Sequence, residues 1–295
     1  QGERGRSTIS GKDIQTLVRG LSLLKRLSVE GCERATTLAI DSANLETLCV
    51  YNAMRLEEVN LQCPRLEELC IHTPPSVYEE RRSGSEDSCN LSSTGAMQLA
   101  RQIGSACSTV RRLHLNIPSL TDRALHEVLI SCTTEVRCLS VTHSKHITDA
   151  SIKEVATSCP HLDLLDLSGA RHITDYALDM ICVAYEFNLR HLLLAACPQL
   201  TCHGIQRAAS KLQAIELLDC GFTITMQEPN SYEKSKSSSS SRSTRHTNGN
   251  KRKRRISDSL EADEELNMES FELRSPCLKK VSLWGCKRIQ VSCQS

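Results

Sequence analysis

The chain of 295 residues has few aromatic side chains: three Phe, five Tyr and one Trp, 3% of the total. Sandwich and barrel cores usually contain more aromatic area, so we expect a core of aliphatic side chains. No window approaches 18 uncharged apolar residues, which excludes a membrane-spanning helix. The first residues contain no apolar stretch, so no secretory signal is visible, and the missing initiator Met is compatible with a piece of a longer protein.

The chain also lacks an excess of charge of either sign. It has 36 basic and 35 acidic residues, a net charge of +1, which argues against a polyanion binder that uses its whole surface. Its 16 cysteines contain no C-x-x-C pair. A disulfide framework is typical of short secreted chains, and structural zinc sites need Cys and His pairs at short fixed spacing. We therefore expect free, reduced thiols that pack as small apolar side chains, with no metal and no cofactor.

A short pattern, apolar-x-x-apolar-x-apolar, recurs nine times along the sequence. The first three matches are 21 residues apart, and most of the later ones are 26 or 27 apart. They begin at Leu24, Leu45, Leu66, Val110, Val136, Leu162, Leu189, Leu212 and Leu278. The alternation predicts a short strand in each unit, and such strands bury their apolar residues by stacking into a parallel ladder.

The second half of each unit must return the chain to the next strand. In the 26-residue units it has apolar residues at helical spacing, and Thr148 and Thr174 are placed to cap these helices. The shorter units have no room for a helix, so an extended return is expected at Leu38 and Ile40 and at Val59 and Leu61. The predicted fold is an α/β solenoid, a curved parallel ladder with helical and extended return segments. Four cysteines are expected at buried corners three residues after a strand's last apolar residue: Cys32, Cys197, Cys220 and Cys286.

The unit CPHLDLLDLSGARHITDYAL at 159–178 resembles the cysteine-containing leucine-rich repeat. This subclass is familiar from F-box/leucine-rich-repeat proteins, the substrate-recognition subunits of SCF-type ubiquitin ligases, and the mixture of unit lengths is similar to plant-type members. The resemblance covers roughly residues 10–223 and 276–289. It implies a non-catalytic adaptor that binds a target protein on its concave face. The F-box, which would dock the ligase scaffold, is not visible and would lie outside this chain.

Two interruptions divide the repeats. We expect 21-residue repeats over 1–72, a loop insertion at 73–93, cysteine-containing repeats over 94–223 and a last repeat at 276–295. Residues 224–275 are Ser-rich, with a basic block followed by an acidic block, and predict a disordered linker.

The basic block of the linker contains a short cationic run. Lys251, Arg252, Lys253, Arg254 and Arg255 are typical of a nuclear-import signal, which predicts a nuclear or nucleo-cytoplasmic location, unless the run only pairs with the acidic block. Ser257 follows two arginines and is a phosphorylation candidate. No aromatic residues alternate with the basic ones, which disfavours a nucleic-acid partner.

Catalytic patterns are missing, so function is expected on a surface. His143 and His146 have no third ligand nearby in the pattern, and no nucleophile or phosphate-binding loop is placed at a strand end. The residues between the buried ones should face the hollow of the arc, and in the last four rungs they include several apolar ones and the single Trp. The predicted partner-binding residues are Leu164, Asp166, His191, Leu193, Ala195, Glu216, Leu218, Lys280 and Trp284, with Ala195, Leu218 and Trp284 in one column.

Three functions remain open on the sequence alone. The first is the substrate-recognition part of an SCF-type ligase, which presents targets for ubiquitin-dependent degradation. The second is an interaction scaffold of the same repeat class without a link to ubiquitin. The third is a nucleic-acid-associated protein that acts through the basic insert. Trp284 could also pack against a C-terminal continuation of the chain or be covered by the linker.

Overall fold

The fold was analysed in a computed structural model of the whole chain. It describes residues 9–33, 35–53, 55–73, 93–132, 135–223, 269–273, 275–284, 286 and 289–292. The predicted import signal at 251–255, Ser257, and most of the predicted loop and linker lie outside these residues.

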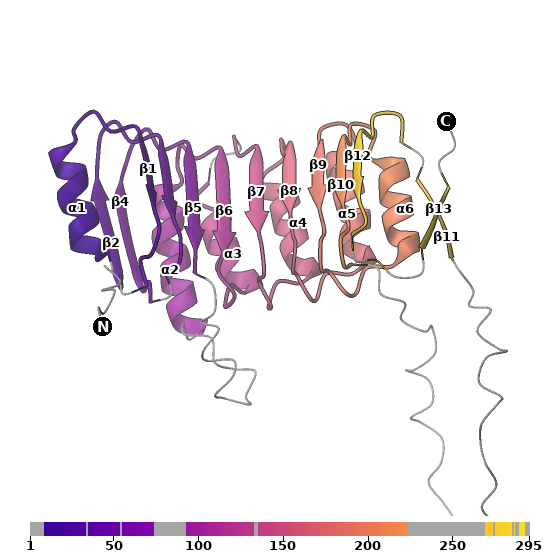
Figure 1. The fold of residues 1–295 in the computed structure, drawn as a ribbon, viewed down its shortest axis with the longest axis horizontal. Coiled ribbons are helices and arrows are strands. Elements are labelled where there is room, and N and C mark those ends of the chain that lie inside the picture. The colour runs from indigo at the N-terminus through magenta and orange to yellow at the C-terminus, as the bar shows by residue number, and fades with distance from the viewer. Residues whose placement is uncertain are drawn as a thin grey trace, which may run out of the picture.

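A single parallel sheet of nine strands runs through the described structure (Figure 1). Its order is β1-β3-β5-β6-β7-β8-β9-β10-β12, so each new unit adds its strand at the same edge. The strands are β1 (Arg26–Val29), β3 (Thr47–Val50), β5 (Glu68–His72), β6 (Arg112–Asn116), β7 (Cys138–Val141), β8 (Leu164–Asp166), β9 (His191–Leu193), β10 (Leu217–Asp219) and β12 (Lys280–Ser282). The α/β leucine-rich-repeat solenoid predicted from the repeat is confirmed.

The register of this sheet follows the sequence repeat. Leu27 pairs with Leu48 and Leu48 with Leu69, which is the 21-residue step. Leu113, Leu139, Leu165 and Leu192 then pair in succession, which is the longer step. All four are fully buried, so the apolar residues of successive strands form one continuous aliphatic file.

A second layer covers one face of the sheet. It holds helices α1 (Gly11–Gly20), α2 (Ser93–Ala106), α3 (Asp122–Leu129), α4 (Asp149–Ser158), α5 (Asp175–Tyr185) and α6 (Cys202–Lys211), with strands β2 (Thr37–Asp41), β4 (Glu58–Gln62), β11 (Glu269–Glu272) and β13 (Ile289–Ser292). Neighbours in this layer pack in chain order: α1 on β2, β4 on α2, and α6 on β11. Figure 1 shows the helices on the same side of the sheet.

The extended returns predicted for the short units are present. Strands β2 and β4 pair in parallel, with Leu38 opposite Val59 and Ile40 opposite Leu61. All four side chains are at most 9% exposed, because α1 and α2 flank the pair. A 21-residue unit thus closes with a strand, whereas a longer unit has room for a helix.

Helices α4, α5 and α6 each begin at a threonine that also joins the helix to the one before it. Thr148 and Thr174 cap α4 and α5, as predicted, and Thr201 caps α6. The Thr174 backbone N–H donates to Asp149 Oδ1 (2.8 Å), and its hydroxyl donates to Asp149 Oδ2 (2.6 Å). Asp122 binds Thr148 in the same way, and Asp175 binds Thr201. The first aspartate of each helix therefore fixes the start of the next one.

Two elements differ from the sequence expectation. Helix α1 was not predicted, although Ser10 and Asp13 form a reciprocal capping box at its start. Strand β11 lies inside the range 224–275 predicted as a disordered linker, and its four residues pair with β13 at the end of the second layer. These residues supply an extended return segment close to the last strand of the sheet.

Candidate protein-binding face

The sheet has an uncovered side, which we call the open face. It is formed by the side chains that alternate with the buried file, so that β3 and β5 show partly exposed and buried residues in turn. In β8 and β9 the open face presents Leu164 and Asp166, then His191 and Leu193, all partly exposed. The backbone pairs Leu164 with His191 and Asp166 with Leu193. These four predicted residues therefore lie together on two adjacent strands.

The position of Leu218 corrects the sequence reading. Leu218 is 1% exposed and pairs with Leu192, so it belongs to the buried file and not to the open face. The residues of β10 on the open face are Leu217 and Asp219, which the sequence analysis did not select. The segment from Leu212 to Cys220 satisfies the apolar pattern twice, starting at Leu212 and at Ile215, and the prediction from Leu212 is wrong. Leu212 instead ends helix α6, where its N–H bonds to the Ala208 carbonyl.

The same shift corrects two further expectations. Cys220 is not a corner residue, because it occupies the second buried position of its strand, and Thr223 takes the corner. The Thr223 hydroxyl donates to the Leu194 carbonyl and accepts from the Cys197 N–H (3.2 Å). The predicted column of Ala195, Leu218 and Trp284 is wrong for the same reason. Backbone hydrogen bonds instead align Ala195 with Gly221 and Gly221 with Trp284.

An exposed aromatic pair stands at the end of the open face. Trp284 is 76% exposed, and its ring centroid lies 4.7 Å from that of Phe222 in an edge-to-face arrangement. Phe222 is 49% exposed and has φ 56°, in the left-handed region that bulky residues rarely adopt. Ala196, Gly169 and His143 have the same backbone conformation one, two and three repeats earlier. The spacing of 26 or 27 residues between these positions was the signal in the sequence that could have identified Phe222 as an exposed residue.

Aspartates on the open face are held in fixed positions. Asp166 accepts from the Ser168 N–H (3.0 Å) and from the Ser140 hydroxyl (3.1 Å). Asp219 accepts in the same way from the Gly221 N–H (3.0 Å). Since Leu193 pairs with both residues, it lies between two oriented carboxylates. Lys280 follows on β12 as an exposed cation, paired with Leu217.

Glu216 lies off the open face, in a row of charged residues that immediately precede the nine strands. The row consists of Lys25, Glu46, Glu67, Arg111, Arg137, Asp163, Arg190, Glu216 and Lys279. Glu216 accepts from Lys279 Nζ (2.9 Å) and lies 3.7 Å from Arg190 Nη1. The hydrogen bond from Lys279 lowers the pKa of the Glu216 carboxyl. Glu216 therefore forms ion pairs with the repeats on both sides of it, at the edge of the predicted site.

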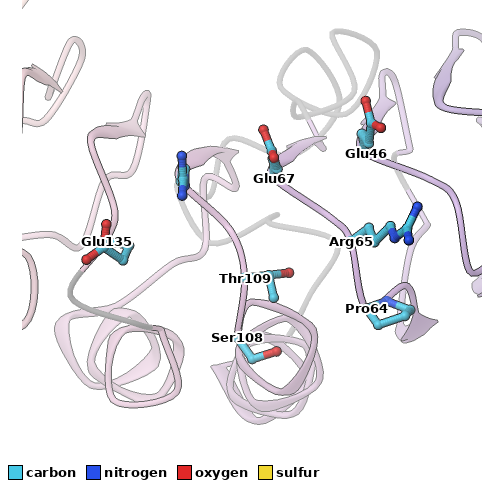
Figure 2. Close-up of a pocket in the computed structure, with 8 residues that line it drawn as sticks. Glu46, Pro64, Arg65, Glu67, Ser108, Thr109 and Glu135 are labelled. Atoms are coloured by element: carbon cyan, nitrogen blue, oxygen red, sulfur yellow. The ribbon is translucent and has the colours of Figure 1, made fainter.

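A pocket of about 420 Å³ opens at this charged edge, between the entries of β3, β5, β6 and β7 (Figure 2). Its lining includes Glu46, Arg65, Glu67 and Glu135. Glu46 is paired with Lys25 (2.8 Å). Because carboxylate and guanidinium groups alternate around the pocket, it selects neither anions nor cations. None of the predicted partner-binding residues lines it.

In the described part of the chain, no group of three or more His, Cys, Asp or Glu side chains is placed to hold a metal ion. Its helices include none that is long and apolar enough to cross a membrane. None of the 14 cysteines that the structure describes forms a disulfide.

Comparisons with known proteins agree with the repeat class. The chain is 30% identical over 285 residues to F-box/LRR-repeat protein 17 of Arabidopsis thaliana, a match that includes 95% of this chain. It spans about two fifths of that relative's length. A solved structure, the complex of Rad7 and Elc1 in yeast, matches with a TM-score of 0.38 and 18% identity over 72% of this chain and 71% of that one, which is too little to support an argument. No protein-family model matches. The resemblance of this chain to the F-box/leucine-rich-repeat family, first recognised from its cysteine-containing repeats, is therefore confirmed.

Proposed function

We propose that this chain is a protein-interaction module, the substrate-recognition part of an SCF-type ubiquitin ligase subunit. In this proposal the open face binds a target protein, and an F-box outside this chain attaches it to the ligase scaffold. The chain acts by presentation rather than by catalysis. The similarity to an F-box/LRR-repeat protein over 95% of the chain supports the ligase context.

The exposed aromatic pair carries the proposal. On the same face, neighbouring strands carry a strip of partly exposed Leu164, Leu193 and Leu217, in which His191 separates Leu164 from Leu217. Asp166, Asp219 and Lys280 border this strip. An apolar centre with a charged rim is the usual composition of a protein interface, and tryptophan is enriched among the residues that dominate binding. We call this set of eight residues the aromatic end of the open face.

Trp284→Ala should weaken target binding by more than about 2 kcal/mol, about 30-fold in Kd, without loss of the fold. Targets would first be sought by crosslinking the wild-type and variant chains in cell extract, with quantitative mass spectrometry, and one purified target would then be titrated by calorimetry. Phe187→Ala is the matched control, since Phe187 is 67% exposed and follows α5 in the other layer.

Phe222→Gly is a second variant for the same test. Glycine adopts positive φ at no steric cost, so this change relieves the backbone while it removes half of the aromatic pair. If Phe222→Gly binds the target more weakly while its midpoint of thermal unfolding is unchanged, the lost affinity belongs to the interface. If Trp284→Ala and Phe187→Ala bind every target equally, the aromatic end is not the binding site.

The link to ubiquitin needs a separate measurement. A target captured through the aromatic end should accumulate in cells that lack the full-length protein, and Trp284→Ala in that protein should not restore its turnover. An interaction scaffold unrelated to ubiquitin would bind the same target and leave its half-life unchanged.

A further inference from the structure

Two cysteines lie side by side at the other end of the open face. Cys49 on β3 and Cys70 on β5 are direct partners in the parallel register. Both are partly exposed, whereas the alternate residues Leu48, Leu69 and Ile71 are fully buried. The buried neighbours fix the two strands, so the thiols are held next to each other by the aliphatic file and not by their own contacts.

The side chains around this pair form a small contact network. Tyr51 follows Cys49 by two residues and, like the two cysteines, is partly exposed. The Tyr51 ring meets the ring of His72 edge to face, with centroids 6.1 Å apart. His114 follows Cys70 on the next strand. Burial lowers the pKa of the His114 imidazole.

The register places the two cysteines close enough to bind one atom between their sulfurs. Neighbouring strands are about 4.8 Å apart, a separation that a disulfide would also allow, so the test below includes that outcome. Two sulfurs that are each about 2.3 Å from one ion lie about 3.3 Å apart when the angle at the ion is about 90° and about 4.6 Å apart when it is about 180°, a range that parallel neighbours reach by side-chain rotation. Sulfur ligands select soft ions.

We propose that Cys49 and Cys70 form a dithiol site on the open face that holds a soft, thiophilic ion through two sulfur ligands. The site lies on β3 and β5, away from the aromatic end, and does not depend on the proposed target. Tyr51, two residues after Cys49, flanks the site and has its ring against that of His72. The ion class comprises trivalent arsenic and monovalent copper, which two sulfurs can hold without a third protein ligand.

Occupation of the site needs no oxidant. With phenylarsine oxide as the ligand, two As–S bonds form, the bond from arsenic to oxygen breaks, and the two thiol protons leave with that oxygen as water. No atom changes its oxidation state. Burial raises the pKa of both thiols, that of Cys70 to about 11, so both protons are present at neutral pH. Low thiolate content also slows oxidation of the empty pair.

The test compares arsenic bound per folded chain in four proteins: wild type, Cys49→Ser, Cys70→Ser and Cys138→Ser. Each is reduced, freed of reductant and titrated with phenylarsine oxide, and the product is weighed by native mass spectrometry. Cys138 is the matched control, because it is also partly exposed on the open face but has Arg112 and Leu164 as strand partners. We expect Cys49→Ser and Cys70→Ser each to lose one equivalent and Cys138→Ser to lose none.

A second titration uses monovalent copper in competition with a coloured chelator. Either serine variant at the pair should lower the copper affinity at least 10-fold, with Cys138→Ser again unchanged. Circular dichroism of each variant verifies the fold. Equal uptake of both probes by all four proteins would overturn the site. The site would also be overturned if the wild-type chain binds neither probe and instead forms a disulfide between Cys49 and Cys70 with equimolar oxidised glutathione.

Discussion

At the scale of single residues, burial separates neighbours that look alike in the sequence. Leu217 and Leu218 are adjacent and chemically identical, yet Leu218 is 1% exposed and Leu217 is partly exposed on the open face. Leu218→Ala should destabilise the fold by about 2–5 kcal/mol, because it leaves a cavity in the buried file. Leu217→Ala should lower the free energy of unfolding by well under half of that amount, as measured by urea unfolding of both variants. The opposite order would show that the register predicted from sequence was right.

This pair also shows where sequence reasoning succeeds and where it stops. The spacing of Leu113, Leu139, Leu165 and Leu192 was sufficient to predict their file, because they follow one another at a step of 26 or 27 residues. Between Leu212 and Cys220 the local pattern fits two registers, and only the 26-residue step from Leu192 distinguishes them, since it ends at Leu218. The exposed Trp284 could be placed from its unit alone, whereas its partner Phe222 lies where backbone conformation, not side-chain type, repeats.

At the scale of elements, the contacts between helix starts hold successive repeats together. Asp149 has both carboxylate oxygens occupied by Thr174, and it also lies in the first turn of α4, where a negative charge is favourable. The last helix, α6, begins with Cys202 in place of an aspartate, and no further described helix follows it. The series of contacts therefore ends where the helical returns give way to β11.

Asp149→Ala should destabilise the fold by about 1–3 kcal/mol, because it leaves the Thr174 N–H and hydroxyl without their acceptor. Asp163→Ala is the control, since Asp163 is a partly exposed carboxylate that immediately precedes β8. Hydrogen exchange would locate the effect, with faster exchange expected at the starts of α4 and α5. A loss of stability spread evenly over all repeats, or equal to that of Asp163→Ala, would contradict a role for this contact in joining neighbouring helices.

At the scale of the whole molecule, the cysteines act as part of the core rather than as reactive groups. Burial raises the pKa of Cys159 and Cys197 to about 12 and that of Cys182 to about 11, and it raises the pKa of Cys220 well above its usual value. Composition and spacing predicted this role. The 21-residue step also aligns Cys49 with Cys70, but only their partial exposure in the structure separates this pair from the buried cysteines.

These raised pKa values predict a loss of stability at alkaline pH. Below about pH 8.5 the thiols are protonated in both states, and their burial is not opposed by ionisation. As the pH rises above this value, thiols ionise in the unfolded chain while buried ones keep their protons, so the unfolded state binds fewer protons and becomes favoured. Each such thiol should lower the free energy of unfolding by about 1.4 kcal/mol per pH unit until its folded pKa is reached.

Urea unfolding at pH 8, 9.5 and 10.5 would measure this decline. Cys197→Ala separates the thiol from other alkaline groups: the variant is less stable at pH 8, because it loses packing, but it has one ionising thiol fewer. Its deficit relative to the wild type should therefore shrink by about 1.4 kcal/mol for each pH unit above the unfolded pKa. A deficit that stays constant with pH would mean that Cys197 ionises as readily in the fold as in the unfolded chain, and that the corner is not dry.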